Sequence, residues 1–198
     1  MQNLRVVKVS QEKPLFQAII PYHLSLIQND AMAVNAFPNF PYEQRLHLSP
    51  QELDPTKCWV IGAAIFQNTN SQDPSLLLLK RAPHEKAFAN AWELPGGHVE
   101  LTDKTIADAV KREVREETSQ VVAEFVGEIE PIAWESRTKS NFQLNYVVTV
   151  RLGDEVKLNP DEHTACMWAR KEQTVSLFMT SEMRKVVRNA FKFAAQAA

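Results

Sequence analysis

The chain reads Arg112-Glu113-Val114-Arg115-Glu116-Glu117 shortly after the turn sequence Leu94-Pro95-Gly96-Gly97. A helix turns by about 100° per residue, so a helix through the first stretch gathers apolar residues on one side. The members of this stripe are Ile106, Ala107, Val110 and Val114. Glu113 and Glu117 project from the edge of the stripe, and Glu116 lies just beside them. The opposite side, which we expect to be solvated, holds Asp108, Lys111, Arg112 and Arg115.

Carboxylates gathered beside a buried stripe repel one another, and they persist where a cation compensates their charge. A cluster that offers only oxygen ligands suits a hard divalent cation, Mg²⁺ or Mn²⁺. The alternative is a solvated surface in which Glu113, Glu116 and Glu117 pair with nearby arginines. Because other residues already fill the solvated face, the pattern favours a metal site.

The bulk properties limit the classes of protein that remain. A length of 198 residues suffices for one globular domain with additions. The net charge is −2 and the positive residues form no block, so we expect neither nucleic acid nor a membrane surface as a partner. The two cysteines, Cys58 and Cys166, are too few for a disulfide framework, which favours a reducing compartment. No signal peptide or membrane span is visible, and we therefore expect a cytoplasmic protein.

Residues 1–56 differ in character from the rest of the chain. Residues 15–27 could form a short helix interrupted at Pro21, and the Pro-rich residues 37–42 predict irregular or extended structure. The segment is too apolar for a disordered tail. We expect an extension that packs on the main domain or on a partner subunit, which would make a homodimer.

From Cys58 onward the pattern predicts an α/β domain. Apolar or β-branched runs predict strands over residues 59–66, 76–79, 121–126, 129–135, 145–150 and 165–169. Thr105 can cap a helix that ends near Glu117 or Thr118, with Asp103 as a competing cap. Ser181 starts a last helix, whose apolar stripe comprises Met183, Val186, Val187, Ala190, Phe191 and Ala194.

The turn and the acidic helix together resemble the Nudix box, whose family pattern is Gly-x5-Glu-x7-Arg-Glu-aliphatic-x-Glu-Glu-x-Gly-aliphatic. This chain has Gly97-x5-Asp103-x8-Arg112-Glu113-Val114-x-Glu116-Glu117-x-Ser119-Gln120. The approach Trp92-Glu93-Leu94-Pro95-Gly96-Gly97-His98-Val99-Glu100 is also similar to that of the family. The resemblance covers about residues 58–192. It implies a Nudix-like α/β/α sandwich with a mixed sheet over residues 57–198, preceded by residues 1–56 as an N-terminal extension.

The chain departs from the family pattern in three ways. The loop between Gly97 and Arg112 has one residue more. The first glutamate is replaced by Asp103, or by Lys104 if one counts back from Arg112. Ser119 replaces the glycine that ends the helix, and Gln120 replaces an aliphatic residue. The change at Ser119 should cost little if another residue makes the left-handed turn. By resemblance, the residue at the position of Asp103 would support Arg112.

By resemblance, the backbone carbonyl of Gly96 and the carboxylates of Glu113, Glu116 and Glu117 would bind the divalent cations. Such cations would hold a pyrophosphate bridge, neutralise the charge that develops on its oxygens and lower the pKa of an attacking water. The family uses a glutamate as general base, and the candidates here are Glu113 and Glu162. Glu162 could equally be an ordinary loop residue.

Residues outside the box suggest where the substrate binds. Arg81 follows an apolar strand, where the family often places a basic residue that faces the substrate phosphates; a surface arginine is the alternative. Trp134 could stack on a base, as could Phe142 and Trp168, although packing is the commoner role of such rings. Arg137 could contact a second phosphate, together with Lys139. The histidines His84, His98 and His163 show no zinc spacing, and we predict no metal role for them.

The resemblance implies a hydrolase that cleaves the pyrophosphate linkage of a nucleoside diphosphate joined to another moiety. A small-molecule phosphoanhydride would be its substrate, and loops outside the box would select the leaving group. The alternative is a catalytically weak Nudix-fold module that binds or senses a nucleotide. A third hypothesis assigns residues 1–56 a docking role, in which case their removal should abolish oligomerisation and leave catalysis intact.

Overall fold

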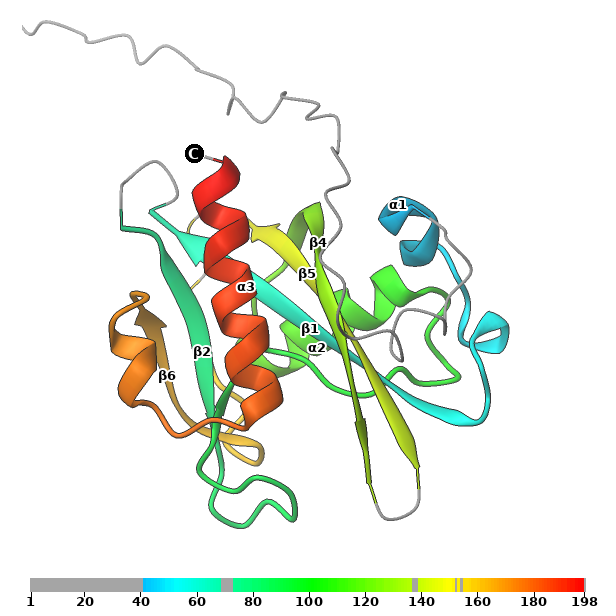
Figure 1. Ribbon diagram of the computed structural model, residues 1–198, viewed down its shortest axis with the longest axis horizontal. Helices are drawn as coiled ribbons and strands as arrows, with labels where there is room; N and C mark the ends of the chain where they lie inside the picture. Colours follow the sequence, from blue (N-terminus) through cyan, green and yellow to red (C-terminus); the bar gives the residue numbers. More distant parts are fainter. Residues whose placement is uncertain (1–40, 69–72, 137–138, 152, 154, 198) are drawn as a thin grey trace, which may run out of the picture.

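A computed structural model (Figure 1) describes residues 41–68, 73–136, 139–151, 153 and 155–197. The helix predicted over residues 15–27 and the predicted phosphate contact Arg137 lie outside this part of the chain. The helical elements are α1 (Tyr42–Leu46), η2 (Pro50–Glu52), α2 (Ile106–Thr118), η3 (Gln173–Ser176) and α3 (Ser181–Ala197). The strands are β1 (Lys57–Gln67), β2 (Ser75–Arg81), β3 (Trp92–Glu93), β4 (Val122–Glu135), β5 (Ser140–Val150) and β6 (His163–Ala169).

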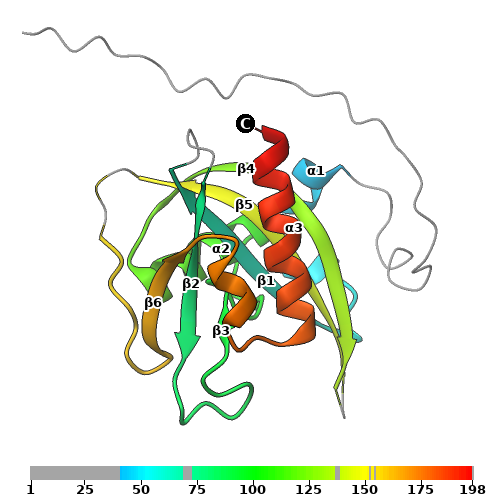
Figure 2. The same ribbon diagram turned by 60° about the vertical axis from the view of Figure 1, so that its left-hand side comes forward.

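The six strands form one mixed sheet in the order β3-β2-β1-β5-β4, with β6 paired to β2. β1 runs parallel to β5, and the other recorded pairings are antiparallel. Figure 2 shows β6 beside β2 at one side of the sheet. The predicted α/β class and mixed sheet are therefore confirmed.

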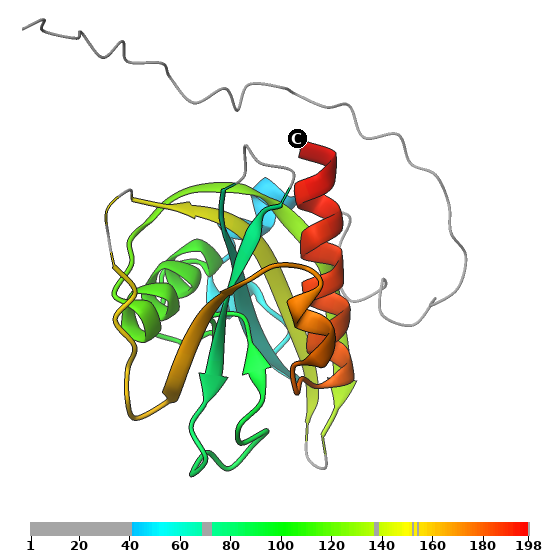
Figure 3. The same cartoon turned by 90° about the vertical axis from the view of Figure 1, so that its left-hand side faces the viewer.

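Helices α2 and α3 cover opposite faces of this sheet (Figure 3). Side chains alternate along a strand, so β1 sends Ile61, Ala63 and Ile65 toward α2 and Ala64 toward α3. β1 consequently reads as one continuous apolar run, because both of its faces are buried. Within the described residues no helix has the length and apolar character needed to span a membrane.

Strands β1 and β2 separate after a short contact, and this separation creates the position of the site. Their recorded pairs are Phe66 with Leu76 and Gln67 with Ser75. Nearer the start of β1, its hydrogen-bonding partner is the turn of residues 95–99 instead of β2. The amides of Ala63 and Ile61 donate to the carbonyls of Pro95 and Gly97, each at 2.8 Å.

Helix α2 begins and ends where predicted, and Ser119 forms its C-terminal end. The hydroxyl of Thr105 accepts a hydrogen bond from the amide of Asp108, so Thr105 is the cap and Asp103 is not. Ser119 itself adopts the left-handed conformation that ends the helix, with φ 59°. The condition under which the change would cost little is therefore not met, and the serine carries a conformational cost of about 1 kcal/mol.

The segments 121–126 and 129–135, predicted as separate strands, are one bent strand, β4. Its register against β5 shifts at three places, one of them between Ile129 and Ile132. Pro131 lies in that interval and has no amide hydrogen to donate, so the irregularity accommodates it without ending the strand.

The described part of the N-terminal extension packs against the α2 face of the domain. Leu46 and Leu53 are buried in the same cluster as the apolar residues of α2. The Arg45 guanidinium donates two hydrogen bonds to the Glu128 carboxylate on β4. That residues 1–56 form a single extension stays a prediction, because residues 1–40 lie outside the described part.

Candidate metal centre

Glu117 is the most deeply buried carboxylate of the helix. Its side chain is 3% exposed, and its Oε2 atom accepts a hydrogen bond from the Gly96 amide at 2.7 Å. Burial raises the pKa of Glu117 to about 9; the Gly96 hydrogen bond opposes this rise, and the nearby charges of Glu113, Glu93 and Glu162 reinforce it. A carboxylate in this position needs a cation to be ionised at neutral pH.

The Gly96-Gly97 turn brings backbone atoms close to the acidic helix. Since the carbonyls of Pro95 and Gly97 point to β1, the Gly96 peptide group between them points away from β1. Gly96 has φ 155°, and a Cβ there would lie 2.1 Å from the Ile61 carbonyl oxygen. The close approach to β1 explains why only glycine fits at position 96, and the Gly96 amide points to the acidic helix, where it donates to Glu117.

Glu113 lies against the same turn. A Cβ on Gly97 would lie within 2.9 Å of both oxygens of the Glu113 carboxylate. Burial raises the pKa of Glu113, although Arg112, which donates to its Oε1 at 2.8 Å, lowers it. Glu116 is different, because its side chain is 54% exposed and contacts Arg112 Nη1 at 3.1 Å.

Arg112 connects the helix to the loop that precedes it. Its guanidinium binds both oxygens of Asp103, at 2.9 and 3.0 Å, and the carbonyl of His98 at 2.9 Å. Burial alone would raise the pKa of Asp103, but hydrogen bonds from Arg112 and the Glu100 amide outweigh it and lower that pKa. Asp103 thus supports Arg112 despite the longer loop. The helical spacing predicted Arg112 on the solvated side of the helix. Its side chain instead folds back toward the Gly96-Gly97 turn and binds the carbonyl of His98.

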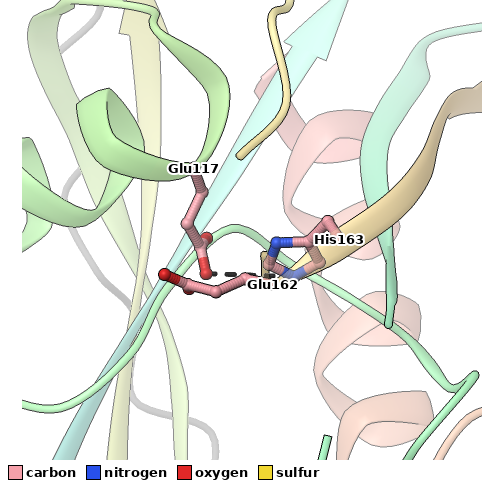
Figure 4. Close-up of side chains that lie close together, drawn as sticks. All are labelled: Glu117, Glu162 and His163. Carbon is pink, nitrogen blue, oxygen red and sulfur yellow. Dashed lines mark ion pairs between the residues drawn. The ribbon is translucent and has the colours of Figure 1, made fainter. Parts of the chain in front are cut away.

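Glu162 and His163 bring a second chain segment to the buried end of α2, at the start of β6 (Figure 4). Ligand atoms of Glu117, Glu162 and His163 all lie within 4.8 Å of one another. The Oε1 atom of Glu162 accepts a hydrogen bond from the Asn159 amide group at 2.8 Å. The backbone carbonyl of Glu162 accepts from the Ala82 amide at 2.7 Å, which anchors this loop to the end of β2.

Sequence patterns had assigned no role to His163 or to Glu93. His163 Nε2 lies 3.2 Å from Glu93 Oε1 and 3.8 Å from Glu117 Oε1. The two residues sit in different short strands, so their approach follows from strand pairing. The only local signals were that His163 adjoins Glu162 and that Glu93 precedes the Leu94-Pro95 turn.

The predicted substrate residues differ in how close they lie to this cluster. Arg81 binds Glu93 and Glu85, each at 2.8 Å, and also the carbonyl of Ala87. It is therefore adjacent to the cluster and already engaged by carboxylates. Trp134 lies near the far end of β4, next to Asn141 of β5, whose side-chain amide donates to the Trp134 carbonyl at 3.3 Å. Phe142, another predicted stacking residue, packs against Trp59 with ring centroids 5.1 Å apart.

The donor set fits a divalent cation. It combines a buried carboxylate of raised pKa, further carboxylates and a backbone turn with room only for glycine. Hard cations take such oxygen donors readily.

Comparison with known proteins finds one family that shares both the sequence motif and the fold. The family described as "NUDIX domain" matches residues 59–190. A zebrafish (Danio rerio) m7GpppN-mRNA hydrolase, NUDT17, is 32% identical over 124 residues, which cover 54% of this chain and 40% of the relative. The Escherichia coli nucleoside triphosphatase NudI is 28% identical over 125 residues, covering 59% of this chain and 87% of NudI. A crystal structure of a MutT NUDIX hydrolase from Burkholderia pseudomallei has a TM-score of 0.57 at 22% identity, covering 67% of this chain and 97% of that one. The chain spans about half the length, or less, of the first curated relatives that it matches.

Proposed function

Because this chain belongs to the Nudix family, we propose that it hydrolyses the pyrophosphate linkage of a nucleoside diphosphate joined to another moiety, with a divalent cation as cofactor. The observation that carries the proposal is the buried Glu117 carboxylate bound to the Gly96 amide at the turn. An ionised group so placed is costly without a cation beside it.

Gly96, Glu113, Glu116 and Glu117 would hold the cation, which we take to be Mg²⁺ or Mn²⁺. When bound, it supplies Lewis acidity at a pyrophosphate oxygen and a water of lowered pKa. The role of Arg112 is to position these carboxylates, because it ties Glu113 and Glu116 to Asp103 and to the turn. Arg112 must give up part of its contact with Glu113 and Glu116 when the cation binds them.

We propose Glu162 as the general base that takes a proton from the attacking water. Glu113 is engaged by Arg112 and is also needed as a ligand, whereas Asn159 occupies only one oxygen of Glu162. A base must lie within hydrogen-bond reach of the water that it activates, and Glu162 lies in the cluster with Glu117. Arg81 lies beside the same cluster. It would face the substrate phosphates once they replace Glu93 and Glu85 as its partners.

The relatives support a nucleoside phosphate as substrate. The named activities of NUDT17 and NudI both concern nucleotides, a capped mRNA in one case and nucleoside triphosphates in the other. The shared chemistry is a phosphoanhydride next to a nucleoside. We also propose a cytoplasmic location, supported by two free cysteines, and a homodimer formed through residues 1–56.

The decisive experiment is a hydrolysis assay with Mg²⁺ or Mn²⁺ and a panel of nucleoside diphosphate compounds, nucleoside triphosphates and capped dinucleotides. Glu117→Gln and Glu116→Gln should each lose several orders of magnitude in rate if the residue is a ligand. Glu124→Gln, which changes an exposed carboxylate on β4, is the matched control. Absence of metal-dependent turnover with every compound would refute hydrolysis. Turnover that survives both ligand substitutions would refute the metal assignment.

A further inference from the structure

We propose that Gln143, positioned by Asn145, recognises the nucleobase of the substrate and selects adenine. The inference rests on the proposed function and deepens it, because it gives the nucleoside a place beside the candidate metal centre. Both residues belong to β5 and lie outside the Nudix box.

Buried amide side chains occupy one face of β5 near the start of the strand. Asn141, Gln143 and Asn145 alternate along β5 and therefore share this face. Gln143 pairs with Ile132, which packs in the apolar cluster beneath α3, so the amides lie on the α3 face of the sheet. Farther along the same face, Val147 belongs to that apolar cluster. Figure 1 shows the start of β5 extending past α3, so the polar side chains occupy the part of the face that this helix leaves.

The amides of Gln143 and Asn145 lie close to the Gly96-Gly97 turn. Gly62 of β1 is the pairing partner of Asn145. A Cβ on Gly62 would lie 2.6 Å from Asn145 Oδ1 and 2.9 Å from Gln143 Nε2, so only glycine leaves room for the two amides. The Gly62 Cα also lies 2.9 Å from the position of a Cβ on Gly96. One strand therefore separates the amides from the turn, which suits a ligand whose phosphates lie at the turn and whose base lies over β5.

The hydrogen bonds of this pair leave Gln143 with unused capacity. Its Nε2 donates to Asn145 Oδ1 at 2.7 Å, and Asn145 Nδ2 donates to the Gln143 carbonyl at 3.5 Å, which together orient the Gln143 amide. Within the described part of the chain, Gln143 Oε1 accepts no hydrogen bond, and a buried amide with an unused acceptor is costly. Gln143 is 6% exposed and Asn145 is fully buried, so Gln143 is the member of the pair that a ligand can reach.

An amide with one acceptor and one donor to spare matches adenine. Gln143 Oε1 would accept from the exocyclic amino group and the second Nε2 hydrogen would be donated to the adjacent ring nitrogen, a two-point contact that glutamine commonly makes with this base. Hypoxanthine has a carbonyl oxygen in place of the amino group, and that oxygen would oppose Oε1 as a second acceptor. Trp134 is half-buried and pairs with Asn141 on the same face, where its ring would stack on the base.

The test uses the full chain with Mg²⁺ and measures by calorimetry the binding of adenosine 5′-monophosphate, inosine 5′-monophosphate and ribose 5-phosphate. The adenosine compound should bind at least about tenfold more tightly than the inosine compound. Gln143→Leu should remove this preference with the fold intact by circular dichroism, whereas Gln44→Leu, which changes an exposed glutamine of α1, should keep it. Trp134→Leu should weaken the binding of both nucleotides about tenfold and leave their ratio unchanged.

Equal affinity of the unmodified protein for the two nucleotides would overturn the inference, whatever the folding of the variants. A preference that persists in Gln143→Leu would also overturn it, as would nucleotide binding no tighter than that of ribose 5-phosphate. These outcomes leave the proposed hydrolysis standing, because that proposal is tested by turnover and by the glutamate variants. Conversely, absence of turnover would refute hydrolysis and leave the adenine preference measurable in binding.

Discussion

Replacing Glu117 by glutamine should stabilise the metal-free protein and remove most of its stabilisation by metal. Glutamine keeps the size of the side chain and can accept the Gly96 hydrogen bond, but it has no charge to bury. The pKa of Glu117 is about 9 in the folded chain, against 4.5 as the ordinary value.

The sign of the pH dependence follows from these two values. Below about pH 4.5 the carboxyl group is protonated in both states and contributes nothing to their difference. Between about pH 4.5 and 9 only the folded chain retains the proton, so each rise of one pH unit lowers the free energy of unfolding by about 1.4 kcal/mol. At pH 7 the accumulated penalty is about 3 kcal/mol, which the glutamine variant would not carry.

Urea unfolding in the presence of a chelator, from pH 5 to pH 8, measures this difference. The stability advantage of Glu117→Gln over the unmodified protein should grow by about 4 kcal/mol across that range. With Mn²⁺ at about 100 times its dissociation constant, the unmodified protein should gain about 2.7 kcal/mol and the variant much less. Parallel pH curves for the two proteins in chelator would refute the argument from burial. Glu124→Gln, which changes an exposed carboxylate, should leave the curve unchanged.

Three further substitutions test the framework around the centre. Gly96→Ala should lower the free energy of unfolding by about 3 kcal/mol or more, because its Cβ would lie 2.1 Å from the Ile61 carbonyl oxygen. The control is Gly153→Ala, at φ 92° with nothing within 4 Å of the added Cβ, which should cost about 1 kcal/mol in the same urea titration. Equal losses in the two variants would contradict the steric argument. Asp103→Asn should reduce kcat by about tenfold to a hundredfold, since it weakens the contact that holds Arg112 in place. Circular dichroism should show an intact fold. An unchanged kcat would show that this contact is dispensable. Arg45→Met should destabilise the domain by about 3 kcal/mol by leaving Glu128 buried without its partner; adding Glu128→Gln should recover most of the loss, and a double variant no more stable than the single one would argue against that pairing.

Local signals explain why helix α2 could be predicted to within a residue. Its cap at Thr105 and its apolar stripe both depend on neighbours a few positions away. Strand β4 was predicted as two strands, with a break at residues 127 and 128, where Gly127 stands. The adjoining strand β5 pairs with β4 on both sides of this position, and no local pattern contains that information.

The carboxylates of α2 could be predicted from their spacing, but their partners could not. The contact between Asp103 and Arg112 depends on how a loop with one extra residue closes, which spacing alone does not determine. Glu93 and His163 meet because β3 and β6 both pair with β2, and this is a property of the sheet order. Side chains brought together by topology are therefore the part of the centre that only the structure identifies.

The hydrogen bond from the Gly96 amide to Glu117 also makes that amide an internal reporter. It connects the turn directly to the most buried carboxylate, so protonation of Glu117 or the arrival of a cation must change the electronic surroundings of this one proton. With five glycines in the chain, the glycine amide signals in a nuclear magnetic resonance spectrum would be few and simple to assign. The resonance of Gly96 could thus follow occupancy of the centre in solution, without substrate.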